Sequence, residues 1–269
     1  MSYRLVALDI DGTIRSPEYP LSDRTRKTLS LVMDAGAYVT IATGRMFRSA
    51  VEATKDLDLR SPIASFQGAH VADPATGEVL WHRPLEPSMA REALDAVAPW
   101  GLDVMAYHSD QVYIREMTPG LKAYGERNRV IVNAVGDLSA LAEKGLTRLV
   151  VEGGEDEIER LERSLKERFD STLYVTRSLP RFCEILHPEG GKDKALGWLC
   201  DYLGVGQEDT IAFGNGYNDV QMLQWAALGV AVAGAVPQVI EVADRTAPPI
   251  EEDGVAHVLE QLLDQGLIG

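Results

Sequence analysis

Residues 5–13 of the chain read LVALDIDGT. The segment begins with a short apolar run, which is typical of a strand buried within a parallel sheet. It continues with two acidic residues, Asp9 and Asp11, and with Gly12, which permits a tight turn of the backbone. Ligands bind beyond the carboxyl ends of the strands in an open parallel sheet. The segment therefore predicts a strand that carries two carboxylates to a ligand site.

Two later segments repeat this arrangement of a short apolar run, a polar loop with glycine and a helical pattern. Residues 39–42 lead into Thr43, Gly44 and Arg45, and residues 210–213 lead into GNGYND, residues 214–219. Three strand ends of one parallel sheet would bring carboxylates, a hydroxyl and amides together. Lys192, at the beginning of another helical pattern, could add a positive charge. Together these groups indicate a site for a phosphoryl group and a Mg²⁺ ion.

The alternation of strand and helix patterns predicts the domain organisation. It runs through residues 1–84 and resumes in residues 188–269, which favours a parallel sheet with right-handed crossovers. Residues 85–187 differ, because strand pairs are interleaved there with helices. We therefore expect an α/β fold. Its doubly wound, mainly parallel core domain is formed by residues 1–84 and 188–269, and an α+β domain is inserted at residues 85–187.

The composition limits the classes of partner. The net charge of −15 disfavours nucleic acid, whose phosphates an acidic surface repels. No apolar run approaches the roughly 20 residues that span a bilayer, so we expect no membrane partner. The two cysteines, Cys183 and Cys200, and the five histidines lack the spacing of a zinc site. With no room for a signal peptide before the first strand, we expect a cytoplasmic protein that acts on a small molecule; its oligomeric state stays open.

The first segment has the residues for phosphoryl transfer. Asp9 and Asp11 repel each other unless a cation lies between them or one of them holds a proton. An ionised carboxylate could bind Mg²⁺ and attack phosphorus, while its protonated neighbour donates to the leaving oxygen. The hydroxyl of Thr43 and the neighbouring N–H groups could hold a phosphate oxygen. Arg45 could face the ligand or lie exposed at the beginning of a helix, and both interpretations stay open.

Oxygen ligands for the metal are available at two strand ends. Mg²⁺ requires octahedral coordination by oxygen, usually with several water molecules retained. Asp9, the backbone carbonyl of Asp11, and Asn215 or Asp219 could supply the protein ligands. Asn218 would brace the loop by hydrogen bonding. Lys194, close to Lys192, could take the role of the phosphate-binding cation instead.

Four segments taken together resemble the motifs of a known superfamily. DIDGT at residues 9–13, TGR at 43–45, GGKDKAL at 190–196 and GNGYND at 214–219 are similar to the four motifs of the haloacid dehalogenase superfamily. Their order and spacing resemble its Cof-type branch, which carries a cap of class IIB between the second and third motifs. The inserted residues 85–187 match that cap in place and size, and the resemblance covers essentially the whole chain.

The resemblance implies a Mg²⁺-dependent phosphatase that hydrolyses a small phosphate monoester, such as a sugar phosphate. Asp9 would be the nucleophile that forms an aspartyl-phosphate, and Asp11 would be the acid and then the base. The implied site has three overlapping sets. The catalytic residues are Asp9, Asp11, Thr43 and Lys192; the phosphate-binding residues are Ile10, Asp11, Thr43, Gly44, Arg45, Lys192 and Asn218; and the metal ligands are Asp9, Asp11, Asn215 and Asp219. The choice of Lys192 over Lys194 rests on the motif match.

The chain departs from the family pattern at two positions. Asn215 stands where the family usually has an aspartate that binds the metal, so the site loses one negative charge and we expect weaker Mg²⁺ affinity. Gln67-Gly68 stands where the family usually has Asn-Gly, which leaves a substrate contact there open.

Three other functions stay open at this point. Within the superfamily, the chain could be a phosphomutase or a phosphatase for a sucrose- or mannosyl-type substrate. From another class, it could be a phospho-accepting signalling module, although such receiver domains are about half as long and lack the cap. It could also be a binding protein that has lost catalysis.

Overall fold

The structure, a computed structural model, describes residues 2–128 and 130–269. These residues divide into two compact units. One unit, the core unit, combines the chain up to Leu80 with Gly191–Gly269, and the other, the inserted unit, is Trp81–Gly190. Among the described residues, no helix is long and apolar enough to cross a membrane.

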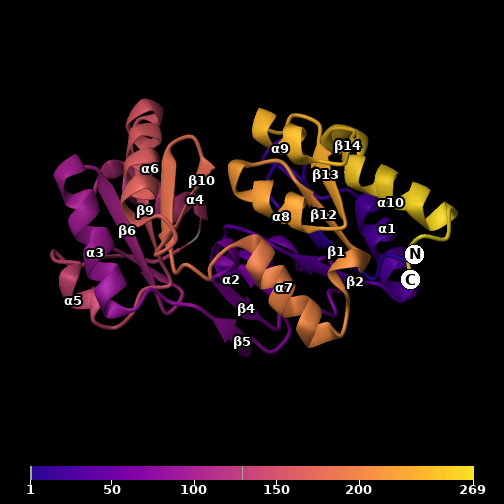
Figure 1. Ribbon diagram of the computed structural model, residues 1–269, viewed down its shortest axis with the longest axis horizontal. Helices are drawn as coiled ribbons and strands as arrows, with labels where there is room; N and C mark the ends of the chain where they lie inside the picture. The colour runs from indigo at the N-terminus through magenta and orange to yellow at the C-terminus, as the bar shows by residue number, and fades with distance from the viewer. Residues whose placement is uncertain (1, 129) are drawn as a thin grey trace. The chain divides into compact units, whose positions relative to one another are not determined.

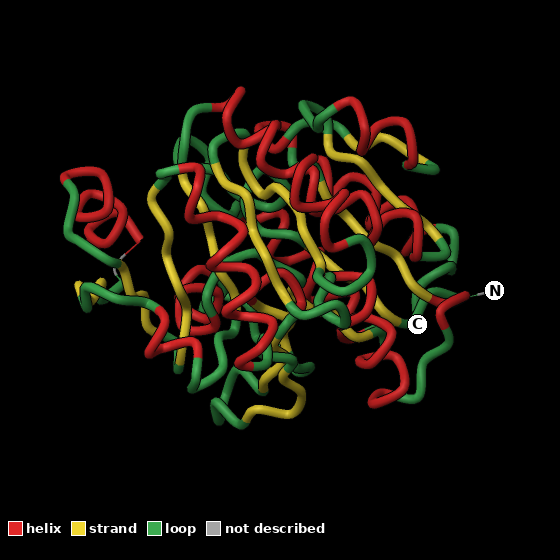
Figure 2. Tube along the Cα trace, turned by 60° about the vertical axis from the view of Figure 1, so that its left-hand side comes forward, coloured by secondary structure: helices red, strands yellow, loops and turns green. Residues whose placement is uncertain are grey.

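The core unit is built on a parallel sheet of five strands in the order β14-β13-β12-β1-β2, seen among the yellow strands of Figure 2. The strands are β1 (Leu5–Leu8), β2 (Tyr38–Ile41), β12 (Thr210–Gly214), β13 (Leu228–Val232) and β14 (Arg245–Ala247). Leu8 of β1 pairs with Phe213 of β12 on one side and with Ile41 of β2 on the other. The three strands with polar ends are therefore adjacent and in register, so their ends meet at one edge of the sheet.

Helices cover the buried strands of the core unit. They are α1 (Asp23–Asp34), α2 (Phe47–Ala53), α7 (Lys192–Leu203), α8 (Val220–Trp225), α9 (Pro237–Val242) and α10 (Gly254–Asp264), drawn in Figure 1. Val6 and Leu8 belong to the apolar cluster that residues of α1 and α10 complete. Leu5 and Ala7, which alternate with them, are buried outside that cluster. The side chains on both faces of β1 are therefore buried, so both faces of the sheet are covered. This is the doubly wound arrangement that the sequence predicts.

Local sequence accounts for the beginning of α1 and the end of α2. The side chain of Ser22 accepts a hydrogen bond from the N–H of Thr25 and caps α1, as a serine before a helix does. Helix α2 is shorter than the run of residues 47–57 that the sequence favours. The hydroxyl of Thr54 donates to the carbonyl of Ala50 (2.8 Å), and the backbone leaves helical geometry at Thr54.

A small antiparallel sheet follows the second helix. Its strands are β3 (Ile63–Ser65), β4 (His70–Ala72) and β5 (Val79–His82), and β3 continues into a single turn of 3₁₀ helix, η1 (Phe66–Gly68). Ala42, just after β2, forms a parallel bridge with Ala64. The loop after β3 is thereby placed next to the end of β2.

The inserted unit is an α+β structure, as the sequence predicts. Its sheet has the order β10-β11-β9-β6-β7-β8, antiparallel except for the pair β7 and β8. The strands are β6 (Asp103–His108), β7 (Gln111–Ile114), β8 (Val132–Ala134), β9 (Arg148–Glu152), β10 (Tyr174–Leu179) and β11 (Phe182–Leu186). The helices are α3 (Pro87–Val97), α4 (Pro119–Asn128), α5 (Ser139–Ala142) and α6 (Glu155–Phe169). The apolar stripe of α6 is buried in the core of this unit.

The compact inserted unit extends a few residues beyond 85–187 at both ends. The ring of His82 lies 3.2 Å from the hydroxyl of Thr147, and Arg83 forms an ion pair with Glu189. These contacts tie both connecting segments to the inserted unit.

Candidate active site

The predicted polar groups gather at one edge of the core sheet. Asp9 directly follows β1, Thr43 lies two residues beyond β2, and Asn215 follows β12. Lys192 is the first residue of α7. All of these residues belong to the core unit, so its own fold brings the site together.

A buried lysine joins two carboxylates at the centre of the site. The Nζ atom of Lys192 lies 2.7 Å from Oδ1 of Asp9 and 2.6 Å from Oδ1 of Asp219. All three side chains are buried. Burial opposes the charge of Lys192, but the carboxylates of Asp219 and Asp9 outweigh it and raise the lysine pKa. Lys194, the other candidate cation, is exposed.

Asp9 lies where its negative charge is poorly compensated. Burial raises its pKa to about 7, and the nearby charges of Asp219 and Asp11 add to this shift, while Lys192 opposes it. One ammonium group is thus shared between two buried carboxylates. The remaining negative charge favours the binding of a second cation next to Asp9.

The turn after β12 fixes the position of Asp219. Its Oδ2 atom accepts hydrogen bonds from the N–H groups of Asn215 and Gly216, both at 2.9 Å. Because a Cβ atom on Gly214 would lie 2.5 Å from Cβ of Asp219, only glycine fits at the end of the strand. Both carboxylate oxygens of Asp219 are engaged, one by Lys192 and the other by the turn.

Asp11 is held by Arg45. The Nε atom of Arg45 lies 2.7 Å from Oδ2 of Asp11, and Nη2 lies 2.7 Å from Oδ1, so the guanidinium group grips the carboxylate with two parallel bonds. Nη1 of Arg45 lies 3.2 Å from the hydroxyl of Ser49. The N–H of Arg45 also donates to the hydroxyl of Thr43 at 3.2 Å. Arg45 therefore links the ends of β1 and β2, a contact that the sequence did not predict.

Asn215 approaches the loop after β1. The hydroxyl of Thr13 donates to Oδ1 of Asn215 at 3.0 Å. A Cβ atom on Gly12, which has a φ of 86°, would lie 2.2 Å from Nδ2 of Asn215, so only glycine permits this approach. The amide oxygen of Asn215 has a second lone pair available for a metal.

The donors fit a hard cation. Within residues 2–128 and 130–269, no cluster of three or more His, Cys, Asp or Glu side chains could hold a metal ion. The candidate set is instead mixed: the carboxylate of Asp9, the amide oxygen of Asn215 and the backbone carbonyl of Asp11. Mg²⁺ takes such oxygen ligands from one or two carboxylates and completes its shell with phosphate and water.

Three predicted residues have other surroundings. The side chain of Ile10 is fully buried in the apolar cluster, so it could contact a ligand only through its backbone. Gly44 lies directly against the amide of Gln67, because a Cβ atom on Gly44 would be 2.4 Å from Nε2 of Gln67. Asn218 is buried and donates through Nδ2 to Oε1 of Gln67 at 2.8 Å. The departure from the family pattern points to Gln67 only as a possible substrate contact, and the sequence does not predict this bond.

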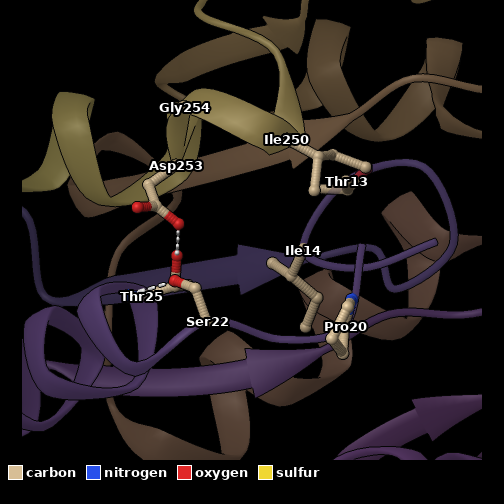
Figure 3. A pocket seen from close by; sticks show the side chains of 8 residues that line it. All are labelled: Thr13, Ile14, Pro20, Ser22, Thr25, Ile250, Asp253 and Gly254. Carbon is tan, nitrogen blue, oxygen red and sulfur yellow. Dashed lines mark hydrogen bonds between the residues drawn. The ribbon is translucent and has the colours of Figure 1, made fainter. Parts of the chain in front are cut away.

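A small pocket lies beside the site rather than in it. Figure 3 shows it between the loop at Thr13, the beginning of α1 and the turn before α10. The hydroxyl of Thr25 lies 3.4 Å from Oδ1 of Asp253 at its wall. Asp9, Lys192 and Asp219 do not line this pocket, so it is not the site of the chemistry.

The chain is similar to known proteins over most of its length. A sequence profile of haloacid dehalogenase-like hydrolases matches residues 6–259. The 5-amino-6-(5-phospho-D-ribitylamino)uracil phosphatase of Bacillus subtilis (strain 168) is 31% identical over 263 residues, which cover 96% of each chain. The HMP-PP phosphatase of Enterobacter sp. (strain 638) is 28% identical and covers 97% of this chain and 96% of its own.

Solved structures share the fold over the whole chain. A protein of Thermotoga maritima has a TM-score of 0.80 at 28% identity, covering 96% of this chain and 97% of its own. A sugar phosphatase of subclass IIB has a TM-score of 0.82 at 22% identity, covering 98% of this chain and all (100%) of its own. The second likeness concerns the fold alone.

Proposed function

We propose, from the premise that this chain belongs to the haloacid dehalogenase-like hydrolase family and is a phosphatase, that it hydrolyses a small phosphate monoester with Mg²⁺ and through an aspartyl-phosphate on Asp9. One observation carries the proposal. Lys192 lies within 2.7 Å of Asp9 and 2.6 Å of Asp219, buried at the meeting point of three strand ends. A cation there can hold the oxygens of a transferring phosphoryl group.

Mg²⁺ would be held by Asp9, the backbone carbonyl of Asp11, and Asn215. Asp219, whose oxygens bind Lys192 and the turn, would add negative charge and keep Lys192 and Asn215 in place. When bound, Mg²⁺ neutralises the repulsion between the Asp9 carboxylate and the phosphate.

In the first step, a carboxylate oxygen of Asp9 attacks phosphorus. The new bond joins Asp9 to phosphorus, and the bond from phosphorus to the ester oxygen breaks. Asp11 gives its proton to that oxygen, so the alcohol leaves in neutral form. Lys192 and the hydroxyl of Thr43 hold the oxygens of the phosphoryl group during the transfer.

In the second step, a water molecule attacks the aspartyl-phosphate. Asp11 takes one proton from the water as its oxygen bonds to phosphorus, and the bond from phosphorus to Asp9 breaks. Inorganic phosphate leaves, Asp9 is a carboxylate again and Asp11 is protonated for the next cycle. Arg45 holds the ionised form of Asp11 through its two bonds of 2.7 Å, and one of these bonds gives way when Asp11 carries the proton.

The substrate is proposed to be a small metabolite, such as a sugar phosphate. This class is supported by the names of the relatives, which act on a ribitylaminouracil phosphate and on HMP-PP. The inserted segment at residues 85–187 is proposed to be the cap of class IIB. The fold it shares with a subclass IIB sugar phosphatase supports this assignment.

The test is hydrolysis of p-nitrophenyl phosphate with Mg²⁺ and with EDTA, followed by a panel of sugar and nucleotide phosphates. We expect turnover only with the metal. Asp9→Asn should lower turnover by about a thousandfold or more, because an amide of the same shape is a poor nucleophile. Substantial turnover by this variant would rule out covalent catalysis by Asp9. Isomerised sugar phosphate instead of free phosphate would identify a phosphomutase, and stable phosphorylation without turnover would identify a signalling module.

A further inference from the structure

The loop after β3 has an unusual backbone. Phe66, Gln67 and Gly68 have φ angles of 50°, 56° and 83°. Two of these residues are not glycine, and the left-handed region is unfavourable for their side chains. Such a conformation persists only where the surrounding contacts impose it, and it is concentrated at functional sites.

The backbone of this loop contacts two segments of the candidate site. The N–H of Phe66 donates to the carbonyl of Arg45 at 2.8 Å, and the N–H of Gln67 donates to the carbonyl of Thr43 at 3.0 Å. A Cβ atom on Gly68 would lie 2.2 Å from the carbonyl oxygen of Gly191, the residue before Lys192. The loop therefore lies against the TGR segment and against the beginning of α7.

The side chain of Gln67 adds a contact to the third segment. It is only 1% exposed. Its Oε1 atom accepts a hydrogen bond of 2.8 Å from Nδ2 of Asn218, and Nε2 lies directly over Gly44. Asn218 directly precedes Asp219, the partner of Lys192. One buried amide thus touches the loop after β2 and the turn after β12.

These two loops lack a direct backbone connection through the sheet. Strands β2 and β12 both pair with β1, which lies between them, and do not pair with each other. A side chain that contacts both loops can fix one directly relative to the other. A glutamine suits this role, because its amide both accepts and donates hydrogen bonds and leaves no buried polar atom without a partner.

We propose that Gln67 is a positioning residue that couples the Thr43–Gly44 loop to the Asn218–Asp219 turn and so sets the geometry of the phosphate site. The proposal deepens the proposed function and rests on it for the identity of the ligand. Gln67 acts through its neighbours and does not contact the substrate, since its amide is buried against Asn218 and Gly44.

The test is a double-mutant cycle read by the binding of inorganic phosphate. Calorimetry in the presence of Mg²⁺ gives the phosphate affinity of wild type, Gln67→Ala, Asn218→Ala and the double variant without requiring turnover. We expect Gln67→Ala to weaken phosphate binding by about tenfold, the effect of losing one buried hydrogen bond. The double variant should bind phosphate no more weakly than Asn218→Ala, because the two residues act through one bond.

Two further variants separate positioning from general destabilisation. Gln67→Met keeps most of the side-chain volume and loses the amide, so it should fold and still weaken phosphate binding as Gln67→Ala does. Gln224→Ala makes the same type of change on the exposed surface of α8 and should bind phosphate as wild type does. Both Gln67 variants should lower kcat/KM equally for an aryl and an alkyl phosphate, since phosphate placement does not depend on the leaving group.

Several results would overturn the proposal. Wild-type phosphate affinity in folded Gln67→Met would show that the amide does not position the site. Additive losses, with the double variant weaker by about a hundredfold, would show that Gln67 and Asn218 act independently. Wild type that fails to bind phosphate would leave no site for Gln67 to position. Wild type that binds phosphate without hydrolysing esters would refute the proposed function while the cycle still tests Gln67.

Discussion

Arg45 holds the carboxylate of Asp11 through two parallel hydrogen bonds of 2.7 Å each. A bidentate guanidinium group fixes the plane of a carboxylate as well as its position. Asp11 is itself exposed, at the turn that follows β1. The orientation of the proposed acid and base therefore depends on a residue that comes from the end of another strand.

This relationship predicts a loss that depends on the leaving group. p-Nitrophenolate leaves readily without a proton, whereas the alkoxide of a sugar phosphate needs one. In Arg45→Ala, kcat/KM for an alkyl phosphate should fall by about a hundredfold and that for p-nitrophenyl phosphate by less than about tenfold, because Asp11 is no longer oriented as the acid. Steady-state kinetics with both esters measures the ratio.

Arg48→Ala is the matched control for this prediction. Arg48 lies on the exposed side of α2, three residues from Arg45, and its loss should leave both esters unaffected. Equal losses for the two esters in Arg45→Ala would point instead to an arginine that binds the phosphate itself.

The raised pKa of Asp9 predicts how the stability of the metal-free protein changes with pH. Burial raises the folded-state pKa from 3.8 to about 7. Between these values the unfolded state ionises while the folded state keeps the proton, so the free energy of unfolding falls as the pH rises through this window. Asp9→Asn cannot ionise and should lack this contribution. Between pH 5 and pH 8, its stability relative to wild type should therefore rise by about 2–3 kcal/mol.

Urea unfolding of both proteins in EDTA, at each pH, measures this difference. Taking the difference between the two proteins cancels the titration of the groups that do not interact with Asp9. A gap between wild type and variant that does not change with pH would contradict the raised pKa.

Lys192 should be essential for stability, unlike its neighbour in sequence. Lys192→Met removes the ammonium group that pairs with the buried carboxylates of Asp9 and Asp219, and it leaves both carboxylates without a compensating positive charge. We expect a loss of about 3–5 kcal/mol in the free energy of unfolding at pH 8, together with loss of turnover. Lys194→Met, at an exposed position two residues away, should change stability by less than about 0.5 kcal/mol. Similar losses in the two variants would refute the assignment of Lys192 as the buried cation.

The meeting of strand ends at this site could be predicted from local sequence. Each strand is a short apolar run that stops at a polar residue, and parallel pairing places such stops at one edge. The register of Leu8 with Phe213 and Ile41 confirms this for β1 and its two neighbours. A run of apolar residues is enough here because β1 is buried along its whole length.

The contacts between side chains could not be predicted in this way. Arg45 reaches Asp11 across 34 positions of sequence, and Asn218 reaches Gln67 across 151. Neither contact leaves a periodic signal, because each depends on which loops the folded sheet brings together. The sequence pattern likewise does not predict α4, β8 and α5. Ile131 and Val135, which flank β8, are exposed, so this strand lacks the buried alternation that identifies a strand.

With Asn215 as a ligand, we expect the site to bind Mg²⁺ less tightly than a site with a carboxylate at this position. The amide oxygen of Asn215 is neutral and already accepts the hydroxyl of Thr13 at 3.0 Å. In Asn215→Asp, the same shape would carry a negative charge next to Asp9, so the affinity for Mg²⁺ should rise on the order of tenfold. Calorimetric titration with Mg²⁺ alone measures the affinity directly, and the half-saturating Mg²⁺ concentration for p-nitrophenyl phosphate hydrolysis should fall in parallel. Gln224→Glu adds the same charge at an exposed position on α8 and should leave both quantities unchanged. Unchanged Mg²⁺ affinity in Asn215→Asp would mean that residue 215 is not a ligand, and the metal would then have to be held by Asp9 and the backbone of Asp11 alone.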